Sequence, residues 1–193
     1  MDVKAGLPII CFESAADWAA WLEANHVQSP GIWIKIAKAG AQQPTVTYPE
    51  ALDLAICFGW IDGQKGSADS EHWLQRFTRR GPRSKWSKVN RQKATALIEQ
   101  ERMRPAGLAE VERARQDGRW DAAYDSPSTA TVPDDLRRAL DSRPNASAFF
   151  ETLDSRNRYA VLYRIQDAKR PETRARRIAE FVTMLDDGRT LYP

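Results

Sequence analysis

Lysine and arginine side chains are concentrated between residues 71 and 100, where eight of them are accompanied by only two acidic residues. Guanidinium groups form paired hydrogen bonds with phosphate and carboxylate groups, so grouped arginines have the chemistry of an anion site. Trp86 lies within this basic segment, and an indole ring can stack on a base or cover a cation. The stretch Ile56–Asn90 therefore indicates a ligand-facing surface.

We predict that indoles, guanidinium groups and small polar side chains of this stretch together form the ligand-binding surface. Its predicted members are Trp60, Asp62, Arg76, Arg80, Arg83, Ser84, Trp86, Ser87 and Asn90. Ser87 precedes an expected helix, whose first N–H groups and dipole also favour anions. The alternative is a solvated basic loop, with exposed arginines that contribute little to stability, Trp86 in the core and Ser87 acting only as a helix cap.

Asp62 follows Trp60 near the start of an expected strand, and three structural or chemical roles are open to it. An aspartate there acts as a general base, pairs with an arginine of the basic segment, or forms a turn or bulge with Gly63. A small-molecule enzyme would require one apolar-walled pocket shared by Asp62, Arg76, Arg80 and Trp86. We assign no catalytic residue from the sequence.

Metal-binding and nucleotide-binding motifs are not found in the sequence. Neither the two histidines nor the two cysteines have the spacing of a metal site, and glycine-rich phosphate loops and serine-hydrolase motifs are missing. We therefore expect no metal and no cofactor. No apolar stretch reaches the ~20 residues of a membrane helix, and no secretion signal is recognisable at the start. We expect a soluble cytoplasmic protein with reduced cysteines and no membrane span.

The elements that position the basic segment follow from local patterns. Thr47 and Glu50 form a capping box for a helix over 47–58, and alternating isoleucines predict a strand over 32–38. Two further strands are expected at 60–66 and 72–78, followed by a loop over 79–85 that is rich in Gly, Pro and Arg. Additional helices are expected at 12–26, where Ser14 and Asp17 form a variant of the capping box, and at 87–101 and 105–118.

Residues 119–132 lack periodicity and are the best candidate for a linker. Helical patterns follow at 133–142, 145–154, 155–169 and 171–187. The predicted fold class is α+β, with a small, mostly antiparallel sheet packed with helices and followed by a helical C-terminal module. The predicted domains are a main body over 1–130 and the module over 131–193.

Motifs in a fixed order run along nearly the whole chain. They are Phe12-Glu13-Ser14 with Trp18, Trp21 and Leu22; Gly31-Ile32-Trp33; Tyr48-Pro49-Glu50-Ala51; Cys57-Phe58-Gly59-Trp60-Ile61-Asp62-Gly63; Arg76-Phe77-Thr78; Ser84-Lys85-Trp86-Ser87-Lys88-Val89-Asn90; Met103-Arg104-Pro105-Ala106-Gly107; and Ala168-Lys169 before Glu172-Thr173-Arg174. In order and spacing they resemble the bacterial YdeI/OmpD-associated family, also called bacteriocin-protection proteins. Arg79 replaces the usual proline of that pattern, and Glu101 replaces a usual glycine.

The resemblance implies protection against bacteriocins and cationic antimicrobial peptides, a connection with an outer-membrane porin, and no established reaction. We therefore expect a non-enzymatic binding or stress-resistance accessory protein, whose basic surface holds an anionic small molecule or an acidic protein surface. The alternatives are a nucleic-acid-binding protein that uses the same surface, with steep salt dependence, and a small-molecule enzyme. The sequence does not indicate the oligomeric state.

Overall fold

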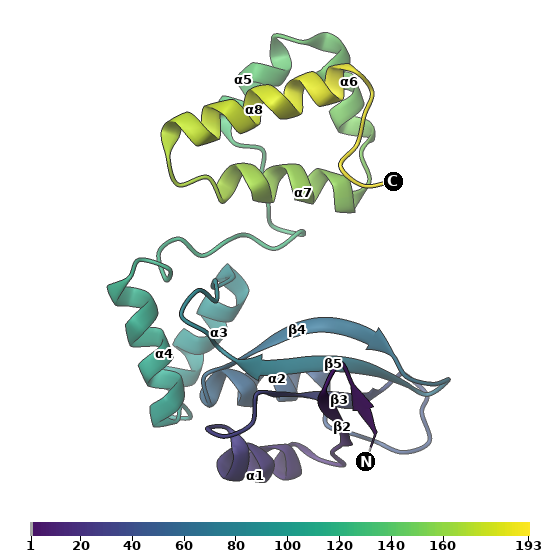
Figure 1. Ribbon diagram of the computed structural model, residues 1–193, viewed down its shortest axis with the longest axis vertical. Coiled ribbons are helices and arrows are strands. Elements are labelled where there is room, and N and C mark those ends of the chain that lie inside the picture. Colours follow the sequence, from purple (N-terminus) through teal and green to yellow (C-terminus); the bar gives the residue numbers. More distant parts are fainter. Residues whose placement is uncertain (1) are drawn as a thin grey trace. The chain divides into compact units, whose positions relative to one another are not determined.

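The computed structural model describes residues 2–193, which contain a five-stranded sheet and eight helices (Figure 1). The strands are β1 (Val3–Lys4), β2 (Leu7–Cys11), β3 (Gly31–Ala37), β4 (Trp60–Ser67) and β5 (His72–Arg79). The helices are α1 (Ala15–Asn25), α2 (Tyr48–Cys57), α3 (Lys88–Glu99), α4 (Pro105–Gln116), α5 (Asp134–Asp141), α6 (Pro144–Thr152), α7 (Ser155–Gln166) and α8 (Pro171–Asp186). The predicted α+β class is confirmed.

The sheet has the strand order β1-β2-β3-β5-β4, and only the β2–β3 pair is parallel. A parallel pair needs a crossover, which α1 provides between these two strands. The prediction of a mostly antiparallel sheet is confirmed. The sequence did not predict β1 or β2, because Leu7–Cys11 contains a proline and shows no alternation of apolar and polar residues.

The main core forms where α1 and α2 pack on one face of the sheet. The isoleucines of β3 point into it, and Ile32 and Ile34 are fully buried. Trp18 of α1 is also fully buried, and its Nε1 donates to the carbonyl oxygen of Ala51 in α2 at 3.1 Å. Both helices begin with the capping boxes that the sequence predicted, Ser14 with Asp17 and Thr47 with Glu50. Local capping thus sets where the core-forming helices begin.

Helix α4 approaches α2 so closely that only a glycine fits at the contact. A Cβ atom placed on Gly107 would lie 2.2 Å from the carbonyl oxygen of Cys57. Before α4, Glu101 has a positive φ of 56°, a left-handed conformation that a glycine adopts without strain. This is the position at which the YdeI/OmpD-associated pattern usually has a glycine. Helix α3 correspondingly ends at Glu99, two residues before the predicted end.

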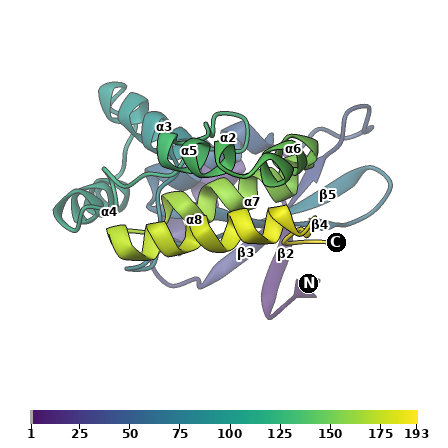
Figure 2. The ribbon, with the colours of Figure 1, turned by 90° about the horizontal axis from the view of Figure 1, so that it is seen from above.

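The chain divides into two compact units. The first contains the residues up to Trp86 and Asn90–Ala122, and the second contains Ser87–Val89 and Ala123–Pro193. Helices α5 to α8 make up most of the second unit, and α7 and α8 run side by side in both views (Figures 1 and 2). Their core is aliphatic and aromatic: Leu136, Leu140, Ala146, Phe150, Val161, Leu162, Ile165, Ile178, Phe181, Val182 and Leu185.

An ion pair joins the first and last helices of this second unit. The guanidinium group of Arg174 in α8 donates to both carboxylate oxygens of Asp135 in α5, at 2.6 and 2.9 Å. Its Nη1 also donates to the carbonyl oxygen of Ile165 in α7, so one side chain of α8 links this helix to two others. Within the described residues, none of the helices combines the length and apolar character that crossing a bilayer requires.

Candidate anion-binding site

The basic segment leaves the sheet at the end of β5 and enters a tight turn. The backbone N–H of Ser84 donates to the carbonyl oxygen of Gly81 at 3.0 Å, and Ser84 Oγ accepts from the N–H of Gly81 at 2.9 Å. Arg83 is exposed in this turn, whereas Ser84 is half-buried. The predicted loop therefore has a defined conformation that presents Arg83 to solvent.

Arg80 and Trp86 form a stacked pair at the base of this loop. The guanidinium carbon of Arg80 lies 3.5 Å from the centroid of the Trp86 ring, and Arg80 Nη1 donates to the carbonyl oxygen of Lys85. Arg80 is only 4% exposed and Trp86 only 1%. Arg80 is therefore not an exposed charge, as the solvated-loop alternative required, because the flat, weakly hydrated guanidinium group packs on the indole face.

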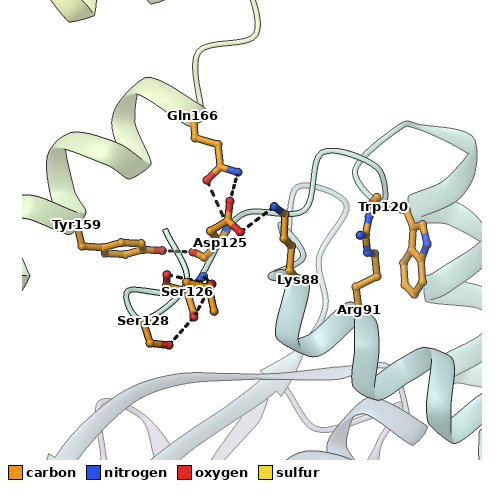
Figure 3. Close-up of polar contacts among 9 residues, drawn as sticks. Lys88, Arg91, Trp120, Asp125, Ser126, Ser128, Tyr159 and Gln166 are labelled. Carbon is orange, nitrogen blue, oxygen red and sulfur yellow. Dashed lines mark hydrogen bonds and ion pairs between the residues drawn. The ribbon is translucent and has the colours of Figure 1, made fainter. Parts of the chain in front are cut away.

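A second indole extends this pair toward the surface. The rings of Trp86 and Trp120 meet edge to face at 5.0 Å, and Trp120 is half-buried. Arg91 of α3 donates from Nη1 to the carbonyl oxygen of Trp120 at 3.1 Å, and both side chains are drawn in Figure 3. Arg115 of α4 lies 5.3 Å from the centroid of the Trp120 ring. Cationic side chains from two helices thus meet at one tryptophan.

The residue before Trp120 connects it to the loop. Arg119 Nη1 donates to the carbonyl oxygen of Ser84 at 2.8 Å, and the same guanidinium group pairs with Asp117. We define the Trp86–Trp120 basic cluster as Arg80, Arg83, Trp86, Arg91, Arg115, Arg119 and Trp120. The sequence prediction missed Arg115, Arg119 and Trp120. The signal that could have found them is the tryptophan with adjacent arginine just after α4.

Asp62 belongs to a separate polar group on β4. Its carboxylate accepts from the hydroxyl of Tyr48 at 2.9 Å and from Nδ2 of Asn90 at 3.3 Å. Asn90 is 8% exposed, and the structure joins two predicted site residues in a partly buried contact. A bulge follows Asp62, as one of the sequence alternatives proposed, and its Gly63 carbonyl oxygen accepts from the buried Gln75 side chain.

Arg76 does not join Asp62. Asp62 is paired in register with Phe77, so Arg76 points to the opposite face of the sheet, where Trp33 is its partner in register. Trp60 is fully buried in the core, and its Nε1 donates to the carbonyl oxygen of His26 at 3.2 Å. The single pocket that the enzyme hypothesis required is therefore not formed by Asp62, Arg76, Arg80 and Trp86.

Two lysines of the basic segment are neutralised by carboxylates. Lys93 in α3 pairs with Asp53 at 2.6 Å, and Lys88 pairs with Asp125 at 2.7 Å, a contact visible in Figure 3. Ser87, another of the predicted site residues, forms an isolated β-bridge with Tyr124. The local positive charge thus resides with the arginines near Trp86 and Trp120, Arg91 of α3 among them, and not with Lys88 and Lys93.

Two different family models match two separate stretches of the chain. Residues 10–110 match a family model described as a domain of unknown function, DUF8412. Residues 129–188 match the model described as bacteriocin-protection, YdeI or OmpD-associated. The chain belongs to the DUF8412 family, and residues 129–188 are similar to the YdeI/OmpD-associated family. A search of curated proteins and a search of solved structures each found no match.

The match confirms the resemblance to YdeI/OmpD-associated proteins that the sequence motifs indicated. At the family level, the match of residues 129–188 supports a bacteriocin-protection-like accessory protein. The YdeI/OmpD-associated match covers helices α5 to α8, whereas the basic segment lies within the DUF8412 match. Neither description states a ligand, so the chemistry of any ligand has to come from the side chains.

Proposed function

We propose that this YdeI/OmpD-associated protein acts by binding an anionic partner on the Trp86–Trp120 basic cluster. The observation that supports it best is the convergence of arginines from a loop, α3, α4 and the segment after α4 on two contacting indoles. Several arginines gathered in one place raise the local positive potential far more than the same number spread over a surface.

The members of the cluster differ in the part they play. Arg80 and Trp86 are buried and hold the loop in shape, so they are positioning residues in this proposal. Arg83 and Arg115 are exposed, Trp120 is half-buried, and Arg115 lies over the Trp120 ring. An acidic surface would meet exposed guanidinium groups beside an indole edge, which is a favourable setting for carboxylate recognition.

The sign of the charge also indicates what the cluster does not hold. A positive surface repels cationic peptides, so protection against such peptides would operate through an anionic partner and not through capture of the peptide. Asp117, which pairs with Arg119, and the exposed Asp121 reduce the positive charge at one side of the cluster. This mixed border favours the acidic side chains of a protein over a continuous run of phosphates.

Binding of poly-L-glutamate followed by tryptophan emission tests the proposal. All seven tryptophans lie at or before residue 120, in the first unit, so emission reports the region that contains the cluster. We expect saturable binding that weakens steeply as salt rises from 50 to 300 mM, since several ion pairs are exchanged for counterions. Replacing both exposed arginines, Arg83→Gln with Arg115→Gln, should weaken binding by about tenfold.

The matched control removes the same charge from the second unit. Arg137 and Arg138 are exposed on α5, and the pair Arg137→Gln with Arg138→Gln should change the affinity by less than about twofold. Equal weakening by the two double variants would show a general charge effect and defeat the proposal. Tighter binding of a 20-nucleotide single strand than of poly-L-glutamate at equal salt would favour the nucleic-acid alternative instead.

A further inference from the structure

The second unit contains a cavity of about 610 Å³ that is separate from the basic cluster. Its lining combines three tyrosines with two arginines: Tyr159, Tyr163, Tyr192, Arg156 and Arg164. This volume is in the range that small-molecule sites usually have. Among the described residues, its lining includes no carboxylate side chain. The cavity is thus aromatic and positively charged.

The floor of the cavity is one stripe of α7. Arg156, Tyr159, Tyr163 and Arg164 recur at helical spacing, while the opposite stripe, with Val161 and Ile165, is buried in the core of the unit. The rings of Tyr159 and Tyr163 lie 5.8 Å apart. A rigid, packed helix therefore presents two aromatic rings between two cations.

One wall is the segment that precedes α5, and Figure 3 shows how it is attached to α7. The hydroxyl of Tyr159 donates to the carbonyl oxygen of Asp125 at 2.8 Å, and burial raises the pKa of Tyr159 to about 12, which keeps this hydroxyl protonated. Gln166 exchanges two hydrogen bonds with Asp125, one with its backbone N–H and one with its carboxylate. These contacts position Pro127 at the edge of the cavity.

The other wall is the end of the chain, which one buried side chain holds in place. Asn157 is 6% exposed, and its Oδ1 accepts from the backbone N–H groups of Leu191 and Tyr192 at 3.1 and 2.9 Å. Its Nδ2 donates to the carbonyl oxygen of Tyr192 at 3.1 Å. Three hydrogen bonds from one amide fix the backbone, and the Tyr192 ring closes the cavity from that side.

The two arginines converge on this ring. The guanidinium carbons of Arg156 and Arg164 lie 4.3 and 5.8 Å from the centroid of Tyr192. In the part of the chain that the structure describes, neither side chain makes an ion pair with a carboxylate. Cations held beside an aromatic wall retain their capacity to bind an anion, and the neighbouring tyrosines offer a surface on which a flat ring can stack.

We propose that this cavity is a binding site for a small aromatic carboxylate, with its ring against Tyr159 and Tyr163 and its carboxylate at Arg156 and Arg164. Both features of the ligand follow from the lining: the aromatic walls select a flat apolar body, and the two cations, which have no carboxylate partner among the described residues, select a negative charge. The site belongs to the second unit alone and does not depend on the function proposed for the basic cluster.

Isothermal titration calorimetry with the full chain and 2-naphthoate tests the site. We expect saturable binding of 2-naphthoate, with at least about tenfold weaker binding of its neutral analogue, 2-naphthalenemethanol, and of butyrate, which has the charge but no ring. Arg156→Gln combined with Arg164→Gln should weaken 2-naphthoate by about tenfold and leave the neutral analogue unchanged. Failure of 2-naphthoate to bind at millimolar concentration would overturn the proposal.

Two further variants separate binding from folding. Arg137→Gln with Arg138→Gln removes equal charge from α5, outside the cavity, and should leave the affinity for 2-naphthoate within about twofold. Tyr192→Ala removes one wall while Asn157 still holds the backbone, and it should weaken binding with the far-ultraviolet circular dichroism spectrum unchanged. If neither Arg156→Gln with Arg164→Gln nor Tyr192→Ala changed the affinity for 2-naphthoate, the ligand would bind elsewhere and the assignment would be refuted.

Discussion

Arginines of the same basic segment occupy opposite environments, and their contributions to stability should differ accordingly. Arg80 is buried against Trp86, whereas Arg83 is exposed three residues later. Arg80→Ala should lower the free energy of unfolding by about 2 kcal/mol, because it removes a desolvated cation–π contact and leaves a void beside the indole. Arg83→Ala should change it by less than about 0.5 kcal/mol.

Urea unfolding followed by tryptophan emission measures both variants, since Trp86 is in the affected unit. Arg80→Lys is a useful third variant because it keeps the charge but lacks the flat group that stacks on the ring. It should fall between the wild type and Arg80→Ala. Equal stability of Arg80→Ala and Arg83→Ala would mean that the stacked pair contributes nothing to folding.

At the scale of elements, the close contact between α2 and α4 requires a glycine at position 107, although helix propensity there favours other residues. Helix propensity alone favours alanine over glycine in a helix interior by about 1 kcal/mol. A Cβ at Gly107 would lie 2.2 Å from the Cys57 carbonyl oxygen, which is backbone and cannot rotate away. We therefore expect Gly107→Ala to destabilise the protein by about 2–3 kcal/mol, because α4 must move to admit the methyl group.

The matched substitution for this test is Ala109→Gly, which lies at an exposed position of the same helix. It should cost about 1 kcal/mol through propensity only. Thermal unfolding monitored by circular dichroism compares the two. A Gly107→Ala protein that melts above the wild type would show that the two helices are not in such close contact.

Element prediction succeeded where the determining signals are local. Ser14 with Asp17 and Thr47 with Glu50 are read within four residues, and both form the capping boxes that the sequence predicted. Strand β2 was missed because its identity depends on β3, more than twenty residues away, and not on its own pattern. The parallel pairing of β2 with β3 is therefore known only from the three-dimensional structure.

The candidate site shows the same division. Alternation along β5 already places Arg76 on the face opposite Phe77, so the separation of Arg76 from Asp62 was within reach of the sequence once the β4–β5 register was known. The contact between Trp86 and Trp120 could not be predicted from the sequence, because α3 and α4 lie between these residues in the chain. Nor does any local pattern state that Asn157 holds the chain end beside α7.

At the scale of the whole molecule, stability depends on pH through carboxylates that are paired in the folded state, and Asp135 is one of them. Hydrogen bonds from Arg174 hold the pKa of Asp135 below its usual value of 3.8, with a smaller contribution from the backbone N–H of Leu136. A carboxylate whose folded pKa is depressed stabilises the fold above its unfolded pKa. That contribution is lost as pH falls toward and through the folded pKa.

Asp135→Asn should therefore destabilise the protein at pH 7 by about 1 kcal/mol, a modest amount because both side chains are partly exposed. The difference from wild type should shrink below pH 4 and vanish once Asp135 is protonated in both states. Urea midpoints at pH 7, 4 and 2.5 measure this, and circular dichroism is the right probe because the second unit contains no tryptophan.

The control is Asp141→Asn, which is exposed on the same helix and should stay within about 0.5 kcal/mol of wild type at each pH. A difference for Asp135→Asn that persists undiminished at pH 2.5 would mean that its cause is not the charge of the Asp135–Arg174 pair.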